Sequence, residues 1–128
     1  MPSKKSFNED KIEKMIHRGE IYLIDLDNQV GSEQSGVRPA VVIQNETGNM
    51  YSPTTIVCPL TSKSKSMSAT HVELTTTDAD ILRDSIVLCE QMRVIDKSRI
   101  KKRLGEVKNL QKIEDINQKI MISVGIGR

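Results

Sequence analysis

The chain has 128 residues, of which 37% are hydrophobic and 28% charged, a composition typical of one soluble globular domain and not of a disordered chain or of two full domains. No apolar run approaches the roughly 20 residues of a membrane span, and the first residues lack the apolar stretch of a signal peptide. We therefore expect a cytoplasmic protein that does not enter a membrane.

The net charge of +2 is distributed unevenly along the chain. Residues 19–92 contain four basic and ten acidic side chains, a net charge of −6, whereas residues 93–112 contain eight basic and two acidic side chains, a net charge of +6. Such a basic segment suits a polyanion or an acidic partner, and the alternative is a merely solvated face. An aromatic content of 2% disfavours a platform of stacked bases of the RRM or OB type.

The first expected element is a short helix near the N-terminus. Asn8 can cap it, Ile12, Met15 and Ile16 recur at helical spacing, and Gly19 would end it.

Short apolar segments rich in β-branched residues follow and predict strands. They cover residues 20–26, 39–45, 54–60, 71–74, 85–91 and 92–97, with turn-forming residues between them. Residues 98–107 are ambiguous because Gly105 weakens either a strand or a helix, and we favour a strand. The segments together predict a small antiparallel sheet or barrel.

An amphipathic helix is expected to follow Asn109 at the end of the chain. Its apolar face would hold Leu110, Ile113, Ile116, Ile120, Met121 and Val124. With this helix closing the sheet, the predicted fold class is α+β, mainly β, built on a small barrel.

Cysteine and histidine residues give no sign of a metal centre. Cys58 and Cys89 lie within apolar runs, as buried thiols of a reducing compartment do. Together with His17 and His71 they lack the spacing of zinc ligands, and neither thiol has the polar surroundings that activate a nucleophile. We expect no metal and no cofactor.

Arg38 is the first candidate for chemistry. It stands immediately before Pro39, which begins an apolar strand, so its guanidinium must meet an anion or water. One alternative is an ion pair with Glu33 or Asp25. The other is a cation directed at phosphate, because the planar guanidinium fork suits phosphoryl oxygens.

Thr61 and Ser62 form a second polar group. They follow the apolar strand 54–60 and lead into a loop rich in serine and lysine, residues 61–70. Such a loop is either a phosphate site or ordinary solvent-exposed chain.

Four segments occur in the order RGEIYLIDL, GSEQSGVRPAVVIQN, TIVCPLTS and DSIVLCEQMRVIDKSRI. As a set they resemble the MazF/PemK family of bacterial toxin endoribonucleases, and a set at this spacing is far more specific than a single short motif. The resemblance runs from about Arg18 to the final helix. It implies a toxin domain over residues 18–128, preceded by an N-terminal helical extension over residues 1–17.

The resemblance implies a homodimer of SH3-like barrels that cuts single-stranded RNA (mRNA) at short sequence motifs without a metal. The ribose 2′-OH would attack the adjacent phosphate, leaving a 2′,3′-cyclic phosphate and a 5′-OH. A cognate MazE-like antitoxin would lay a disordered acidic tail across the dimer and block the RNA groove.

Position by position, the resemblance makes Arg38 and Thr61 the catalytic pair. The positions that would bind or read RNA are Ser32, Glu33, Gln34, Ser62, Asp84, Ser85, Glu90 and Gln91, through hydrogen bonds to unstacked base edges. His71 matches no catalytic position, so we interpret it as structural.

This chain departs from relatives that carry histidine at the position of Ser32 and arginine at the position of Leu88, so their acid–base assignment does not transfer. Because arginine stays protonated, the role of Arg38 is mainly electrostatic; the general base is open, with Glu33 as a candidate proton acceptor.

Two other functions compete with the ribonuclease. One is a gyrase poison of the CcdB type, which shares the barrel, and the other is a catalytically silent RNA-binding module. The pair Arg38 and Thr61 favours the ribonuclease, because a poison that acts by protein binding does not need it.

Overall fold

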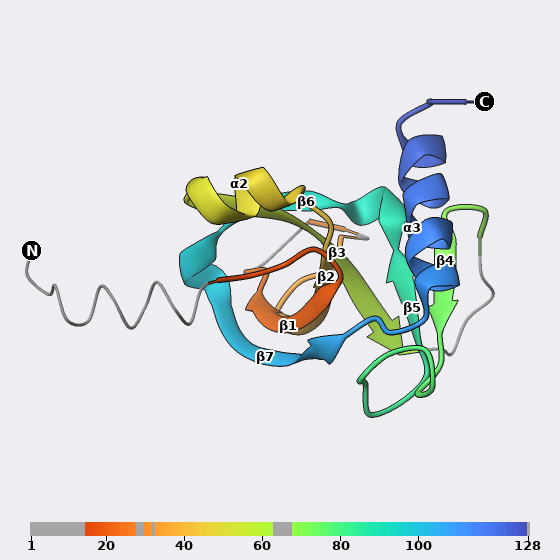
Figure 1. Cartoon of the computed structure of the whole chain (residues 1–128), viewed down its shortest axis with the longest axis horizontal. Helices are drawn as coiled ribbons and strands as arrows, with labels where there is room; N and C mark the ends of the chain where they lie inside the picture. Colours follow the sequence, from red (N-terminus) through yellow and green to blue (C-terminus); the bar gives the residue numbers. More distant parts are fainter. Residues whose placement is uncertain (1–14, 28–29, 32, 63–67, 128) are drawn as a thin grey trace, which may run out of the picture.

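Seven strands, one long helix and several short helical turns make up the computed structural model, which describes residues 15–27, 30–31, 33–62 and 68–127. In chain order the elements are β1 (Glu20–Asp25), β2 (Val37–Val42), α2 (Glu46–Tyr51), β3 (Thr54–Ser62), β4 (His71–Leu74), β5 (Ser85–Leu88), the 3₁₀ turn η1 (Cys89–Gln91), β6 (Arg93–Asp96), the 3₁₀ turn η2 (Lys97–Arg99), β7 (Ile100–Glu106) and α3 (Leu110–Ser123). Figure 1 shows the curved sheet with α3 standing beside β4 and β5.

The strands pair antiparallel in the order β4-β5-β3-β2-β1-β7, and β6 also pairs with β3. β3 is central: β6 lies along its first half, Thr54–Val57, and β5 along its second half, Leu60–Ser62. Among the described strands, β4 and β7 remain at the two ends of the sheet. The predicted mainly β fold with a C-terminal helix is confirmed, with a curved sheet that is not closed.

Both faces of the central strands are buried, which explains their continuous apolar runs. Because successive side chains point to opposite faces of a strand, Val41 and Cys58 enter the core beneath α3, whereas Val42 and Val57 enter the core enclosed by the curved sheet. Ile116 is the buried residue by which α3 closes the first core.

The C-terminal helix and the strand over β7 are confirmed, and Asn109 caps α3 by accepting a hydrogen bond from the backbone N–H of Gln111 at 3.0 Å. The six-residue helix α2 was not predicted. It begins because Asn45 accepts a hydrogen bond from the N–H of Gly48 at 2.8 Å, where the glycine suggested only a turn.

Two further expectations are corrected. Residues 89–91 form the turn η1 and do not continue strand β5. Residues 15–17 are not helical, and the rest of the expected N-terminal helix lies outside the described residues. Within the described ranges, no helix is long and apolar enough to cross a membrane.

Candidate functional site

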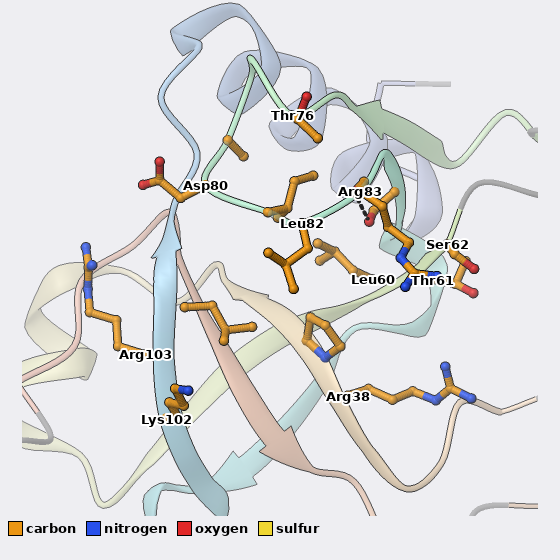
Figure 2. Close-up of a pocket in the computed structure, with 15 residues that line it drawn as sticks. Arg38, Leu60, Thr61, Ser62, Thr76, Asp80, Leu82, Arg83, Lys102 and Arg103 are labelled. Atoms are coloured by element: carbon orange, nitrogen blue, oxygen red, sulfur yellow. Dashed lines mark hydrogen bonds between the residues drawn. The ribbon is translucent and has the colours of Figure 1, made fainter.

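A pocket of about 770 Å³ opens between the ends of three strands, the edge strand β7 and the loop over residues 75–84 (Figure 2). Its lining is Arg38 and Pro39 from β2, Leu60, Thr61 and Ser62 from β3, Ser85 from β5, Lys102, Arg103 and Leu104 from β7, and Thr76, Ala79, Asp80, Ile81, Leu82 and Arg83 from the loop. Both members of the predicted catalytic pair therefore lie in one cavity.

Arg38 and Thr61 come from the paired strands β2 and β3. Ala40 of β2 pairs with Pro59 of β3 at the end of their ladder. Arg38 and Thr61 each lie two residues beyond this pair, and both line the pocket. The side chain of Arg38 is tethered by Nε, which donates to the carbonyl oxygen of Ser35 at 2.7 Å. Its two terminal nitrogens make no hydrogen bond or ion pair with the described residues, so they are available to an anion.

The ion-pair alternative for Arg38 is not what the described structure shows. Glu33 accepts a hydrogen bond from the N–H of Val30 at 3.2 Å, and Asp25 accepts one from the N–H of Asp27 at 2.9 Å. Neither carboxylate forms a salt bridge with Arg38 within the described ranges.

Hydroxyl groups converge on the same end of the pocket. Ser62 pairs with Ser85 across β3 and β5, and Ser85, which is 8% exposed, donates to the carbonyl oxygen of Arg83 at 3.0 Å. Thr61 is half-buried and Ser62 is exposed. Of the predicted RNA-binding residues, Ser62 and Ser85 therefore lie in the pocket with Arg38 and Thr61.

A second group of predicted residues gathers away from the pocket lining, around η1. The side chain of Gln91 accepts a hydrogen bond from the N–H of Gln34 at 2.8 Å. Glu90 accepts one from Thr70 Oγ1 at 2.9 Å and contacts Nε2 of His71 at 3.1 Å. His71 thus orients Glu90, in agreement with a structural role.

Glu90 is held as a carboxylate by this arrangement. Partial burial acts to raise its pKa, but its own backbone amide, the Thr70 hydroxyl and His71 together lower the pKa below its ordinary value.

The remaining predicted residues are dispersed. Glu33 lies on the β1–β2 loop outside the pocket lining, and exposed Asp84 accepts a hydrogen bond from the N–H of Thr76 at 3.1 Å. Ser32 lies outside the described residues.

Sequence reasoning missed most of the pocket's basic wall. Lys102 and Arg103 were assigned only to the general basic segment, and Leu82 and Arg83 were not singled out. The sequence feature that could have identified Leu82 and Arg83 is their position in a loop directly before Asp84 and Ser85, two predicted RNA-binding residues.

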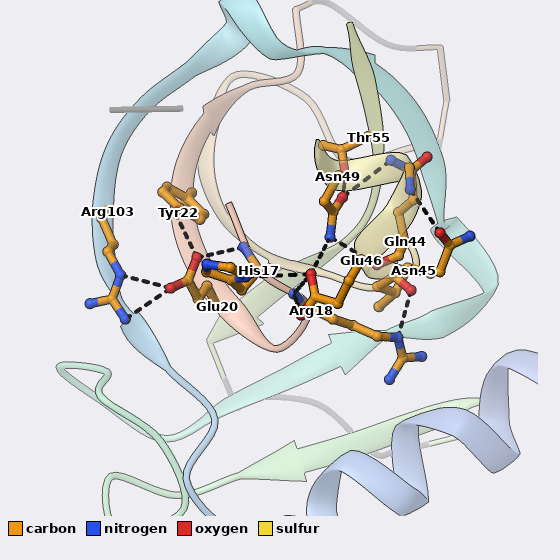
Figure 3. A network of polar contacts seen from close by, with 12 residues as sticks. His17, Arg18, Glu20, Tyr22, Gln44, Asn45, Glu46, Asn49, Thr55 and Arg103 are labelled. Carbon is orange, nitrogen blue, oxygen red and sulfur yellow. Dashed lines mark hydrogen bonds and ion pairs between the residues drawn. The ribbon is translucent and has the colours of Figure 1, made fainter. Parts of the chain in front are cut away.

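The pocket's charges are only partly compensated. Arg103 pairs with Glu20, whose other oxygen accepts a hydrogen bond from the Tyr22 hydroxyl at 2.7 Å (Figure 3); burial and this carboxylate raise the pKa of Tyr22. Asp80 pairs with Lys108 at 2.8 Å. The cationic groups that keep no anionic partner among the described residues are the ends of Arg38, Arg83 and Lys102, so the pocket favours an anionic ligand.

Cys58 and Cys89 are both fully buried, as the sequence predicted. The neighbouring Cys89 thiol and burial raise the pKa of Cys58 far above its ordinary value, so this thiol does not supply a nucleophilic thiolate. No group of three or more histidine, cysteine or acidic residues in the described ranges is arranged to hold a metal ion.

Comparison with known proteins gives the family. The model of the PemK-like, MazF-like toxins of type II toxin–antitoxin systems matches residues 17–124. The chain belongs to this family. Endoribonuclease MazF of Staphylococcus saprophyticus is 44% identical to it over 113 residues, which are 88% of this chain and 93% of that protein.

Solved structures agree with the fold. A crystal structure of MazF from Deinococcus radiodurans has a TM-score of 0.75 at 26% identity, with 88% of this chain and 98% of that chain covered. A mycobacterial endoribonuclease in complex with its cognate antitoxin has a TM-score of 0.73 at 20% identity, with the same coverage of both chains, and at this identity shares only the fold. The predicted family and endoribonuclease class are confirmed.

Proposed function

We propose that this endoribonuclease toxin cuts single-stranded RNA at a short sequence motif without a metal. The ribose 2′-oxygen attacks the adjacent phosphorus, the bond from phosphorus to the 5′-oxygen breaks, and the products are a 2′,3′-cyclic phosphate and a 5′-OH end. The proton lost by the 2′-OH is balanced by the proton that the departing 5′-oxygen gains. The observation that carries this proposal is the juxtaposition of Arg38 and Thr61 in one cationic pocket.

Arg38 is suited to stabilise the crowded phosphorus. Its Nε is held by Ser35, which fixes the plane of the guanidinium, while its terminal nitrogens remain available for two phosphoryl oxygens. Charge stabilisation of this kind needs groups that are already oriented before the reaction, which the tether supplies. The Thr61 hydroxyl, on the facing strand, is the hydrogen-bonding partner for the same phosphate.

Recognition of the RNA sequence is assigned to polar groups at two places. Ser62 and Ser85 line the pocket in which the reacting phosphate is proposed to bind, and Gln34, Glu90 and Gln91 form the second group around η1. Ser32, Glu33 and Asp84 are proposed to contact the RNA on its path past the loops. Carboxylate and amide groups discriminate among bases by hydrogen bonds to their edges.

The proposal includes a homodimer and a cognate MazE-like antitoxin. Two observations support the antitoxin: the family description, and the complexes of relatives with theirs. The exposed lysines of β7 offer an acidic tail the same attraction that they offer RNA.

The deciding experiment incubates the purified protein with a long, sequence-diverse single-stranded RNA in excess EDTA and maps every fragment end. We expect discrete cuts at one motif, 5′-OH and 2′,3′-cyclic phosphate ends, and loss of most of the single-turnover rate in Arg38→Ala with an unchanged melting temperature. Thr61→Val, which keeps the side-chain shape, should also lose most of the rate.

Lys119→Gln is the control, because it removes a positive charge from α3 outside the pocket lining. An unchanged single-turnover rate for Arg38→Ala would contradict the catalytic role of Arg38. An uncut RNA that the protein still binds indicates the silent RNA-binding module, and absence of both cutting and binding leads to a gyrase supercoiling assay.

A further inference from the structure

The loop over residues 75–84 is fixed against strand β7. Ala79 forms an isolated antiparallel bridge with Val107. The N–H of Asp80 donates to the carbonyl oxygen of Glu106 at 3.0 Å, and the N–H of Glu106 donates to the Asp80 carboxylate at 3.2 Å. The same carboxylate pairs with Lys108 at 2.8 Å. This side of the pocket is therefore held in place before any ligand arrives.

The fixed loop presents two side chains that the fold itself does not use. Leu82 is 99% exposed, and the guanidinium of exposed Arg83 has no hydrogen-bond or ion-pair partner among the described residues. Both line the pocket, and Figure 2 shows Arg83 extending toward Thr61 and Ser62. An exposed leucine and an arginine that has no anionic partner among the described residues thus stand side by side on the wall of the pocket.

Arg38 and Arg83 reach this pocket from different elements, β2 and the loop, and the phosphate backbone of an RNA strand offers an anion at every nucleotide. One guanidinium suits the phosphate that reacts, which leaves the second for a neighbouring phosphate.

The pocket has no aromatic side chain among its lining residues, although RNA-binding sites commonly stack unpaired bases on aromatic rings. The only aromatic residues in the described part of the chain are Tyr22, which is 3% exposed, and Tyr51, which lies on α2. Among the apolar side chains that line the pocket, Leu82 at 99% exposure offers a base the most accessible surface, ahead of Leu104 at 37%.

We propose that Arg83 binds the RNA phosphate next to the one that is cleaved, and that Leu82 packs against the base of that nucleotide. This inference rests on the proposed ribonuclease function and adds two substrate-binding residues to it. The loop and β7 fix where this nucleotide sits, so it is held in register with Arg38 and Thr61.

The test uses a short RNA that carries the mapped motif, with a 2′-deoxy nucleotide at the cleavage position so that binding is measured without reaction. Arg83→Gln should weaken binding about tenfold and lower the slope of log affinity against log salt by about 0.7, the value of one phosphate contact with a single strand. Lys119→Gln, a charge removed from α3, should change neither. Both variants should keep the melting temperature of the parent protein, because neither Arg83 nor Lys119 forms an ion pair with the described residues that the substitution would remove.

A second measurement locates the phosphate. A neutral methylphosphonate is placed at each position in turn; at the phosphate next to the cleavage site it should weaken binding by the parent protein but not weaken binding by Arg83→Gln any further. Additive losses at every position would overturn the assignment of Arg83.

Leu82→Ala is tested in the same way against an RNA with one abasic nucleotide. Loss of the base and loss of the leucine should not add at the adjacent position, and full additivity there would overturn the role of Leu82. If the parent protein cleaves RNA while Arg83→Gln and Leu82→Ala bind and cleave RNA normally, this inference is wrong and the proposed ribonuclease function still stands. If the parent protein neither binds nor cleaves RNA, the proposed function itself has failed.

Discussion

Gly105 of β7 lies against Asp80 of the β4–β5 loop so closely that a Cβ atom at position 105 would stand 2.1 Å from the Cβ of Asp80 and 2.9 Å from its carbonyl oxygen. No side chain fits there, so only glycine lets the loop dock on the strand. The residue that made the sequence ambiguous between strand and helix is thus explained by a contact that is distant along the chain.

Gly105→Ala should lower the free energy of unfolding by about 1–3 kcal/mol, because the added methyl group forces the loop away from β7. RNA cleavage should fall even where the variant is fully folded, since the displaced loop carries one wall of the pocket. Urea unfolding monitored by circular dichroism measures the first effect. Lys101→Ala, at an exposed position of the same strand, should stay within about 0.5 kcal/mol of the parent; equal midpoints for both variants would contradict the clash.

Asp78 makes stability depend on acid pH. The carboxylate is 8% exposed and accepts hydrogen bonds from the N–H of Thr75 at 2.9 Å and from the side chain of Asn109 at 2.9 Å. The Thr75 amide, followed by Asn109, lowers the pKa of Asp78 below its ordinary value.

A carboxyl whose pKa is lower in the folded than in the unfolded state stabilises the fold above the unfolded pKa, about 3.9, and loses that contribution as pH falls through the folded pKa. The parent protein should therefore exceed Asp78→Asn in unfolding free energy at pH 6, with the difference shrinking below about pH 4. Denaturant titrations at several pH values measure it. A difference that is constant from pH 6 to pH 2.5 would exclude Asp78 as the source.

Helix α2 is anchored by a buried polar network (Figure 3). Asn49, 2% exposed, accepts a hydrogen bond from the hydroxyl of Thr55, 0% exposed, at 2.7 Å, and its amide nitrogen donates to the carbonyl oxygen of Gln44 at 2.9 Å. Lys97 donates a hydrogen bond to the backbone carbonyl oxygen of Asn49, and burial lowers the pKa of Lys97.

Asn49→Ala should lower the free energy of unfolding by about 2–4 kcal/mol, because it leaves the buried Thr55 hydroxyl and the half-buried Gln44 carbonyl oxygen without their partner. Adding Thr55→Val should cost less than Thr55→Val costs alone, since the hydroxyl has already lost its acceptor. Gln118→Ala, which removes an exposed amide of α3 bonded to Glu114 at 3.0 Å, is the control and should change little. Strict additivity of the two core substitutions would contradict the network.

The basic strand β7 should govern the salt dependence of binding. Replacing Lys101, Lys102 and Arg103 together by glutamine should flatten the slope of RNA or antitoxin affinity against salt, because fewer counterions are displaced. Lys102 alone should account for more of the slope than Arg103, whose charge is already shared with Glu20 at 3.3 Å. Fluorescence anisotropy at four salt concentrations measures both, and an unchanged slope for both ligands would make this strand a solvated face.

The strands and α3 were predictable because their apolar residues follow local periods of two and 3.6. Helix α2 was not, because its six residues carry a glycine and depend on Asn49 reaching Thr55, a residue in another element. The open sheet was also hidden from the sequence, since a period of two sets which face is buried and not which edges pair.

The residues of the pocket also fall into some that the sequence could predict and some that it could not. Arg38 and Thr61 could be named from motif positions, and both line the pocket beyond the last pair of β2 and β3. Arg83 and Leu82 could not be predicted as pocket residues, because their position depends on the contact of Asp80 with Gly105 and on the bridge between Ala79 and Val107. These contacts join segments far apart in the chain and leave no local pattern.

Strand β1 pairs along one edge with β2, the next strand in the chain, and along its other edge with β7. In the pairing with β7, Tyr22 lies opposite Arg103. During synthesis the outer edge of β1 stays unpaired until β7, the last strand of the chain, has been made, and the pocket lacks one wall until then. A ribosome that stops before β7 releases a fragment that cannot assemble the site. The assembled pocket is thus confined to chains that have been synthesised at least as far as β7.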